Sequence, residues 1–183
     1  MKKKGFTHES QSALSVEWYT PKWVFDELGL AFDVDVCAPA GGVEWIPSRQ
    51  HFHRENCGLA NDWAGTVWCN PPYGSQTALW LERMAAHKDG VALVFARTDC
   101  AWFHNYVAAA DAILFMKGRI RFVDAFGVSG GSGAGSGSML VAWGDKCVSA
   151  LEKMEQNGLG FLTRGKARMQ SAASTQLSLI IEA

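Results

Sequence analysis

Short apolar runs alternate with amphipathic, helix-like segments along most of this 183-residue chain, and this alternation constrains the fold more than any other feature. Strands are expected at residues 31–37, 66–69, 91–96, 112–116 and 139–143, with a further candidate at 176–181. Helices are expected at residues 20–28, 75–87, 101–110 and 146–156. Because strands that alternate with helices are typical of α/β proteins, we expect an α/β fold built on an open, mostly parallel sheet.

The length of the chain suits one compact domain. Residues 1–15 are polar and lack periodicity, so we expect a flexible N-terminal arm, followed by a single domain over residues 16–183. Residues 129–138 consist almost entirely of glycine and serine and predict a flexible loop. Residues 43–62 mix polar and aromatic side chains without a clear period, so the sequence assigns no element there.

Composition limits the classes of function that the chain can serve. Seventeen Lys and Arg against eighteen Asp and Glu give a net charge of −1, so a nucleic-acid partner would need positive charge gathered on one face. The five cysteines are scattered singly, without zinc-finger spacing, which predicts reduced thiols and no metal site. We find no signal peptide and no apolar run long enough for a membrane span, and we therefore expect a cytoplasmic protein.

The stretch Asn70-Pro71-Pro72-Tyr73 follows directly after the apolar run at residues 66–69. In open α/β sheets ligands bind beyond the carboxyl ends of the strands, where this stretch is expected to lie. The Asn70 side-chain oxygen and the Pro71 carbonyl can accept hydrogen bonds from an exocyclic amine conjugated to a ring, while the prolines fix the backbone between them. Tyr73 offers a face on which a base can stack. The alternative interpretation is a plain turn that ends a strand.

A second group of residues suits a nucleoside-containing methyl donor. The strand at 31–37 ends near Asp35, and the small-residue turn that begins with Ala38 and Pro39 lets the backbone approach a nucleoside closely. Asp35 could face the charged methionine portion of the donor, and Asp62 could accept a hydrogen bond from its adenine amino group. Each carboxylate could equally serve as a solvated side chain or as the cap of a turn.

The ordered set of motifs resembles the phage-type DNA adenine-N6 methyltransferases over roughly residues 17–143. The segments that carry the resemblance are W-Y-T-P (18–21), F-D-V-D-V-C-A-P (32–39), N-D-W (61–63), W-C-N-P-P-Y (68–73), A-R-T-D-x-x-W-F (96–103) and K-G-R-I-R-F (117–122). The resemblance implies a Rossmann-like fold with helices on both faces of the sheet, S-adenosylmethionine as methyl donor, methylation of adenine N6 in DNA, and a phage or prophage origin in a bacterial host. It also implies that Asn70 to Tyr73 carry the catalytic motif, and that Thr20, Pro21, Asp35 and Asp62 occupy donor-binding positions.

DNA has to reach such a pocket, and a base inside a duplex cannot meet the donor methyl group. We therefore expect the base to be extruded, or the substrate to be single-stranded. Basic and aromatic side chains that follow expected strands are the candidate DNA contacts: Arg97, Lys117, Arg119, Arg121 and Phe122. Taken singly, each basic residue could also be ordinary surface charge, and Arg97 could form an ion pair with Asp99.

Two other functions compete with DNA methylation. A protein glutamine-N5 methyltransferase faces the same conjugated nitrogen and would use the same motif, whereas a cytosine-N4 enzyme usually carries serine or aspartate at the position of Asn70. A non-catalytic DNA- or nucleotide-binding relic of the fold is the second alternative. It is motivated by the incomplete glycine turn after the first strand and by the lack of a clear ribose-binding acid, for which Glu44 and Glu55 are weak candidates.

Overall fold

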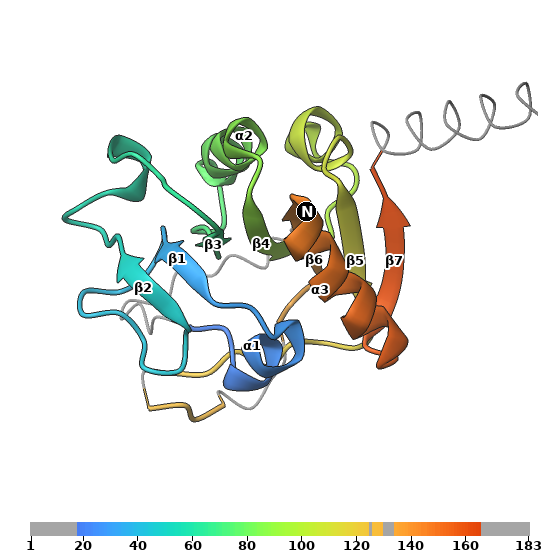
Figure 1. Ribbon diagram of the computed structural model, residues 1–183, viewed down its shortest axis with the longest axis horizontal. Coiled ribbons are helices and arrows are strands. Elements are labelled where there is room, and N and C mark those ends of the chain that lie inside the picture. The colour runs from blue at the N-terminus through green and yellow to red at the C-terminus, as the bar shows by residue number, and fades with distance from the viewer. Residues whose placement is uncertain (1–17, 125, 130–133, 166–183) are drawn as a thin grey trace, which may run out of the picture.

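The computed structural model describes residues 18–124, 126–129 and 134–165, and within them the chain forms one mixed sheet flanked by helices (Figure 1). The strands are β1 (Phe32–Asp35), β2 (Ser48–His51), β3 (Val67–Cys69), β4 (Gly90–Phe95), β5 (Ala112–Met116), β6 (Ser138–Trp143) and β7 (Gly160–Arg164). The helices are α1 (Lys22–Leu28), α2 (Thr77–His87) and α3 (Asp145–Gln156), with short helical turns η1 (Gly58–Ala60) and η2 (Phe103–Val107). The strand order is β2-β1-β3-β4-β6-β5-β7.

The expectation of a mostly parallel sheet is only partly met. The pairings β2–β1, β1–β3 and β3–β4 are parallel, whereas β4–β6, β6–β5 and β5–β7 are antiparallel. The difference arises at β6, which inserts between β4 and β5 and runs against both. No helix separates β5 from β6 in the described residues, and an antiparallel neighbour needs no crossover helix. The strand direction reverses from β4 to β6 and again from β6 to β5, so β5 points in the same direction as β1, β3 and β4.

Helices cover both faces of the sheet, and each face has its own apolar core. On one face α1 and α3 pack over the sheet. The ring of Phe25 in α1 meets the rings of Phe32 and Trp68 edge to face, with 4.8 Å between the centroids of Phe25 and Trp68. On the other face α2 and η2 pack over the sheet through Trp80, Leu81 and other buried residues. The two cores fix the backbone of the central strands, and so they fix the strand ends that carry the site.

The expected strands at 31–37, 66–69, 91–96, 112–116 and 139–143, and the helices at 20–28, 75–87 and 146–156, are found with small shifts of their bounds. The helix expected at 101–110 is shorter and includes the π-helical turn η2. β2 and β7 were not predicted. The N-terminal arm (1–15), part of the Gly/Ser loop (130–133), and the candidate strand at 176–181 lie outside the described residues.

Candidate active site

The carboxyl ends of β1, β2, β3 and β4 meet at one edge of the sheet around a cavity of about 940 Å³. β1 leads to β2 on one side, while β3 lies on its other side, so this is the point where the strand order reverses. The cavity is lined by Trp18, Val36, Cys37, Ala38, His53, Arg54, Cys57, Gly58, Asn70, Pro71, Pro72, Tyr73, Gln76, Trp80, Phe95, Phe122 and Ala134. All four residues of the Asn-Pro-Pro-Tyr stretch therefore lie in its wall.

The turn after β3 is fixed by two hydrogen bonds and one ring stack that the sequence did not indicate. The hydroxyl of Thr77, at the start of α2, donates to the Pro72 carbonyl (3.0 Å) and accepts from the Gly74 N–H (3.1 Å). Tyr73 stacks on Phe95, the last residue of β4, with ring centroids 4.0 Å apart and an interplanar angle of 10°. The turn is thus fastened to both α2 and β4.

The two acceptors expected to hold a substrate amine differ in the hydrogen bonds that they already accept within the protein. The Tyr73 hydroxyl donates to the Asn70 side-chain oxygen (3.2 Å). No hydrogen bond to the Pro71 carbonyl is found within the described residues. An amide oxygen carries two lone pairs, so Asn70 can accept a second hydrogen bond, and the Pro71 carbonyl is available for another.

The segment that follows β2 contributes lining residues that sequence reasoning missed, namely His53, Arg54, Cys57 and Gly58. A Cβ atom on Gly58 would lie 2.3 Å from the Val36 carbonyl oxygen, so only glycine fits the close approach of this segment to β1. The signal that could have found these residues is the same strand-end rule, applied to a strand that the polar sequence of β2 concealed.

Arg83 of α2 braces this segment from behind. Its guanidinium donates to the carbonyls of Gly58 (3.2 Å), Leu59 and Asn61, and lies 4.6 Å from the ring centroid of Trp63. The Trp63 indole N–H also donates to the Gly58 carbonyl (2.8 Å), and its ring stacks on Trp80. The cavity wall formed by Gly58 and Trp80 is therefore supported by the stacked planar groups of Arg83, Trp63 and Trp80.

Of the residues expected to contact the donor, Ala38 lines the cavity and the others do not. Pro39 is half-buried and Asp62 is exposed, and neither belongs to the lining. Asp35 is buried at the end of β1, where its carboxylate accepts from the Cys37 N–H (3.1 Å). Burial raises the pKa of Asp35 to about 7, against a smaller lowering by that hydrogen bond.

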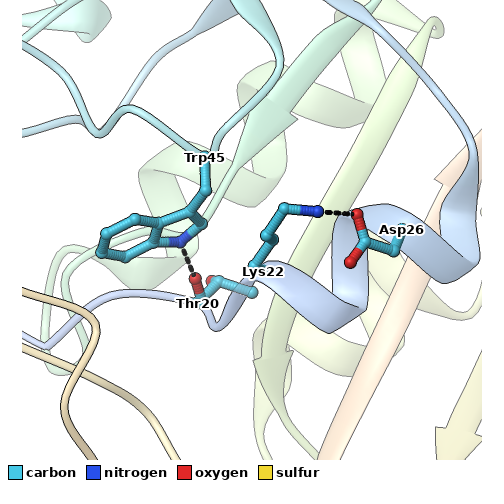
Figure 2. A network of polar contacts seen from close by, with 4 residues as sticks. All are labelled: Thr20, Lys22, Asp26 and Trp45. Atoms are coloured by element: carbon cyan, nitrogen blue, oxygen red, sulfur yellow. Dashed lines mark hydrogen bonds and ion pairs between the residues drawn. The ribbon is translucent and has the colours of Figure 1, made fainter.

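Thr20 and Pro21 lie at the start of α1, beside the loop that carries Trp45 (Figure 2). Pro21 occupies the N-cap position of α1, and no side chain caps the helix by a hydrogen bond. The Trp45 indole N–H donates to the Thr20 carbonyl (2.9 Å), and Figure 2 also shows the ion pair between Lys22 and Asp26 on the helix surface. The hydroxyl of Thr20 is buried without a partner among the described residues.

The candidate DNA-binding residues separate into three settings. Phe122 lines the cavity, whereas Arg97 lines a second hollow of about 290 Å³ that shares Tyr73 and Phe95 with the first. Lys117, Arg119 and Arg121 are exposed in the segment that follows β5, and Arg119 donates to the Ala134 carbonyl (2.7 Å). The alternative ion pair between Arg97 and Asp99 is not found among the described residues.

Two of the cysteines, Cys37 and Cys57, line the cavity. The sulfur atoms of Cys37 and Cys69 lie 4.0 Å apart, and Cys57 is exposed. Burial, followed by the hydrogen bond with Cys69, raises the pKa of Cys37, so this thiol is protonated at neutral pH. In the described part of the chain no three His, Cys, Asp or Glu side chains are grouped to hold a metal ion. Among the helices of the same residues, none has the length and apolar character of a membrane span.

Comparison with protein-family models matches residues 8–158 to the family described as DNA N-6-adenine-methyltransferase (Dam). The chain belongs to this family. Membership of the Dam family implies a DNA methyltransferase, in agreement with the resemblance drawn from the motifs. Neither the comparison with curated proteins nor that with solved structures gave a match.

Proposed function

We propose that this protein transfers a methyl group from S-adenosylmethionine to the N6 amino group of adenine in DNA, after extrusion of the base into the cavity at the strand ends. One observation carries the proposal. The Asn70 side chain and the Pro71 backbone lie together in the wall of a large cavity, at the carboxyl end of a central strand, on a turn fastened at Thr77 and Phe95.

The chemistry follows from the conjugated amine of adenine, which is a poor nucleophile because its lone pair is delocalised into the ring. Hydrogen bonds from the two N–H groups to the Asn70 oxygen and the Pro71 carbonyl would favour a tetrahedral nitrogen and localise that lone pair. Acceptors that are already in place need no rearrangement during the reaction. The amine can lose its proton after methyl transfer, so this account requires no strong general base.

The residues that line the cavity fit the proposed donor. A volume of about 940 Å³ lies at the upper end of the range for small-molecule sites and leaves room for a base beside the donor. Ala38 and Gly58 allow close approach to the backbone, and Arg54 offers a positive charge to the donor carboxylate. When bound, S-adenosylmethionine supplies a sulfonium methyl group that needs no further activation.

Extrusion would place the target base against Tyr73, whose side chain is 38% exposed at the cavity. Stacking on an aromatic ring contributes about 1–3 kcal/mol per base and is not specific to sequence. Lys117, Arg119 and Arg121 lie beyond β5, which points in the same direction as the strands around the cavity, and are available to DNA phosphates.

The test uses purified protein, a labelled methyl donor, unmethylated DNA and a mixture of proteins as competing acceptor. We expect label in the DNA as N6-methyladenine, and roughly 100-fold slower transfer by Asn70→Ala, the loss typical of removing one positioned acceptor. Calorimetry with the donor should give similar affinity for both forms. Label in protein glutamine would support the glutamine-N5 alternative, and donor binding without transfer to any acceptor would support the non-catalytic one.

A further inference from the structure

The most exposed large apolar side chain in the described part of the chain is that of Phe126, which is 89% exposed. It belongs to the tip segment (residues 126–129), which also exposes Val128 and which protrudes at the lower left margin of the molecule in Figure 1. The described residues leave most of the Phe126 ring uncovered, so its apolar surface can be buried by a partner.

The tip segment is held in place by hydrogen bonds rather than by packing. The Asp124 carboxylate accepts from the Phe126 and Val128 N–H groups, each at 2.9 Å. The Asp124 N–H donates to the Val128 carbonyl (2.9 Å), and the Gly127 N–H donates to the Asp124 carbonyl (3.0 Å). Gly127 has a φ of 79°, a conformation that a side chain would strain. The exposed ring of Phe126 is therefore presented on a shaped turn.

The base of the tip segment joins elements of the cavity. Val123 pairs with Ser129 on one side and with Tyr19 on the other, and the neighbours Phe122 and Trp18 both line the cavity. The exposed cations Arg119 and Arg121 lie shortly before Val123 along the chain. An exposed apolar ring that lies close in sequence to basic side chains, on a segment whose base joins two residues of the pocket wall, matches the chemistry of a duplex opened at one base pair.

We propose that Phe126 is the wedge that enters the base stack and fills the space left by the extruded adenine. This inference rests on the proposed function and adds the residue that stabilises the open duplex. Unstacking a base is unfavourable, and proteins that distort DNA offset this cost by inserting apolar side chains between base steps. Arg119 and Arg121 contact the flanking phosphates, while Asp124 keeps its charge directed at the backbone of the tip segment.

The proposal is tested by methylation of one unmethylated DNA in its native duplex form and after heat denaturation. For Phe126→Ala we expect kcat/KM on the duplex to fall about tenfold or more, because the insertion that offsets unstacking is lost. The same variant should keep its activity on denatured DNA, where no base pair has to open, and Phe126→Trp should restore activity on the duplex. Phe161→Ala is the matched control, since Phe161 is 68% exposed on the edge strand β7 and should change neither value.

A binding measurement keeps the two proposals separate. Fluorescence anisotropy with a duplex that contains one abasic site should show tighter binding by the wild-type protein than an intact duplex does, and Phe126→Ala should lose this preference. This result stands even if no methyl transfer is detected, in which case the proposed function fails and the wedge survives.

Three outcomes would overturn the wedge. They are an equal loss on native and denatured DNA, no loss on either together with no abasic preference in the wild type, and a dimer in gel filtration that dissociates in Phe126→Ala while the ratio of the two activities stays unchanged. The last result would assign Phe126 to self-association.

Discussion

The hydroxyl of Tyr73 occupies one lone pair of the Asn70 oxygen that the substrate amine requires. If the ring serves for stacking and the hydroxyl only orients Asn70, the two parts of the side chain should separate by mutation. We expect Tyr73→Phe to change kcat/KM by no more than a few-fold, and Tyr73→Ala to lower it about 10- to 100-fold through the lost stacking surface. Steady-state methylation kinetics give both values, and equal losses in the two variants would contradict this division of roles.

Burial of Asp35 predicts a pH-dependent stability. Its pKa is raised from 3.8 to about 7 in the folded protein, so between these values the unfolded chain releases a proton that the folded protein retains. The contribution of Asp35 to the free energy of unfolding therefore falls as pH rises from about 4 to 7, by up to about 4 kcal/mol, and is constant above 7.

Asp35→Asn should remove this fall and be more stable than the wild type at pH 8, because the amide oxygen can still accept from the Cys37 N–H. Urea unfolding at pH 5 and pH 8 measures the difference between the two proteins. Asp62→Asn serves as control, since Asp62 is exposed and should leave the pH dependence unchanged. A constant difference between wild type and Asp35→Asn at both pH values would contradict the account.

Strands and helices show where the sequence was informative and where it was not. The buried strands β3, β4, β5 and β6 have continuous apolar runs, and periodicity therefore located them. β2 and β7 are the two edge strands, and their sequences, S-R-Q-H and G-F-L-T-R, show no such run because they are largely accessible to solvent.

The missed strand β2 explains the missed part of the site. His53, Arg54 and Gly58 lie beyond its carboxyl end and could not be placed without it. The antiparallel insertion of β6 was equally inaccessible, since the pattern of a single strand does not say which neighbours it will pair with. The Asn70–Tyr73 turn was located correctly because it directly follows an apolar strand.

Arg83 of α2 donates hydrogen bonds to the segment after β2, and weakening these bonds should lower both the stability of the protein and its affinity for the donor. Arg83→Lys keeps the charge but cannot reach three carbonyls with one planar group, so we expect about 1–3 kcal/mol less stability and a raised KM for the donor. Arg49→Lys is the control, because Arg49 is 84% exposed and pairs with Asp33 at 3.5 Å, an ion pair of little energetic weight. A normal KM in a destabilised Arg83→Lys would show that the brace supports the fold alone.

The whole molecule carries a net charge of −1, so any attraction to DNA depends on where its cations lie. Lys117, Arg119 and Arg121 are exposed beyond the carboxyl end of β5. If each contacts one phosphate, replacing any one by Gln should reduce the slope of log affinity against log salt concentration by about 1. Lys153→Gln on α3 is the matched control and should leave the slope unchanged. Unchanged slopes in all three site variants would place DNA on another face.

The measurement that tests the account most directly is the amount of N6-methyladenine in DNA from cells that lack adenine methylation of their own and express either the wild-type protein or Asn70→Ala. Nucleoside mass spectrometry should detect N6-methyladenine with the wild type and none above background with Asn70→Ala, at equal levels of folded protein. Equal amounts of N6-methyladenine with both proteins would contradict the role of Asn70, and its absence with folded, donor-binding wild type would contradict adenine methylation itself.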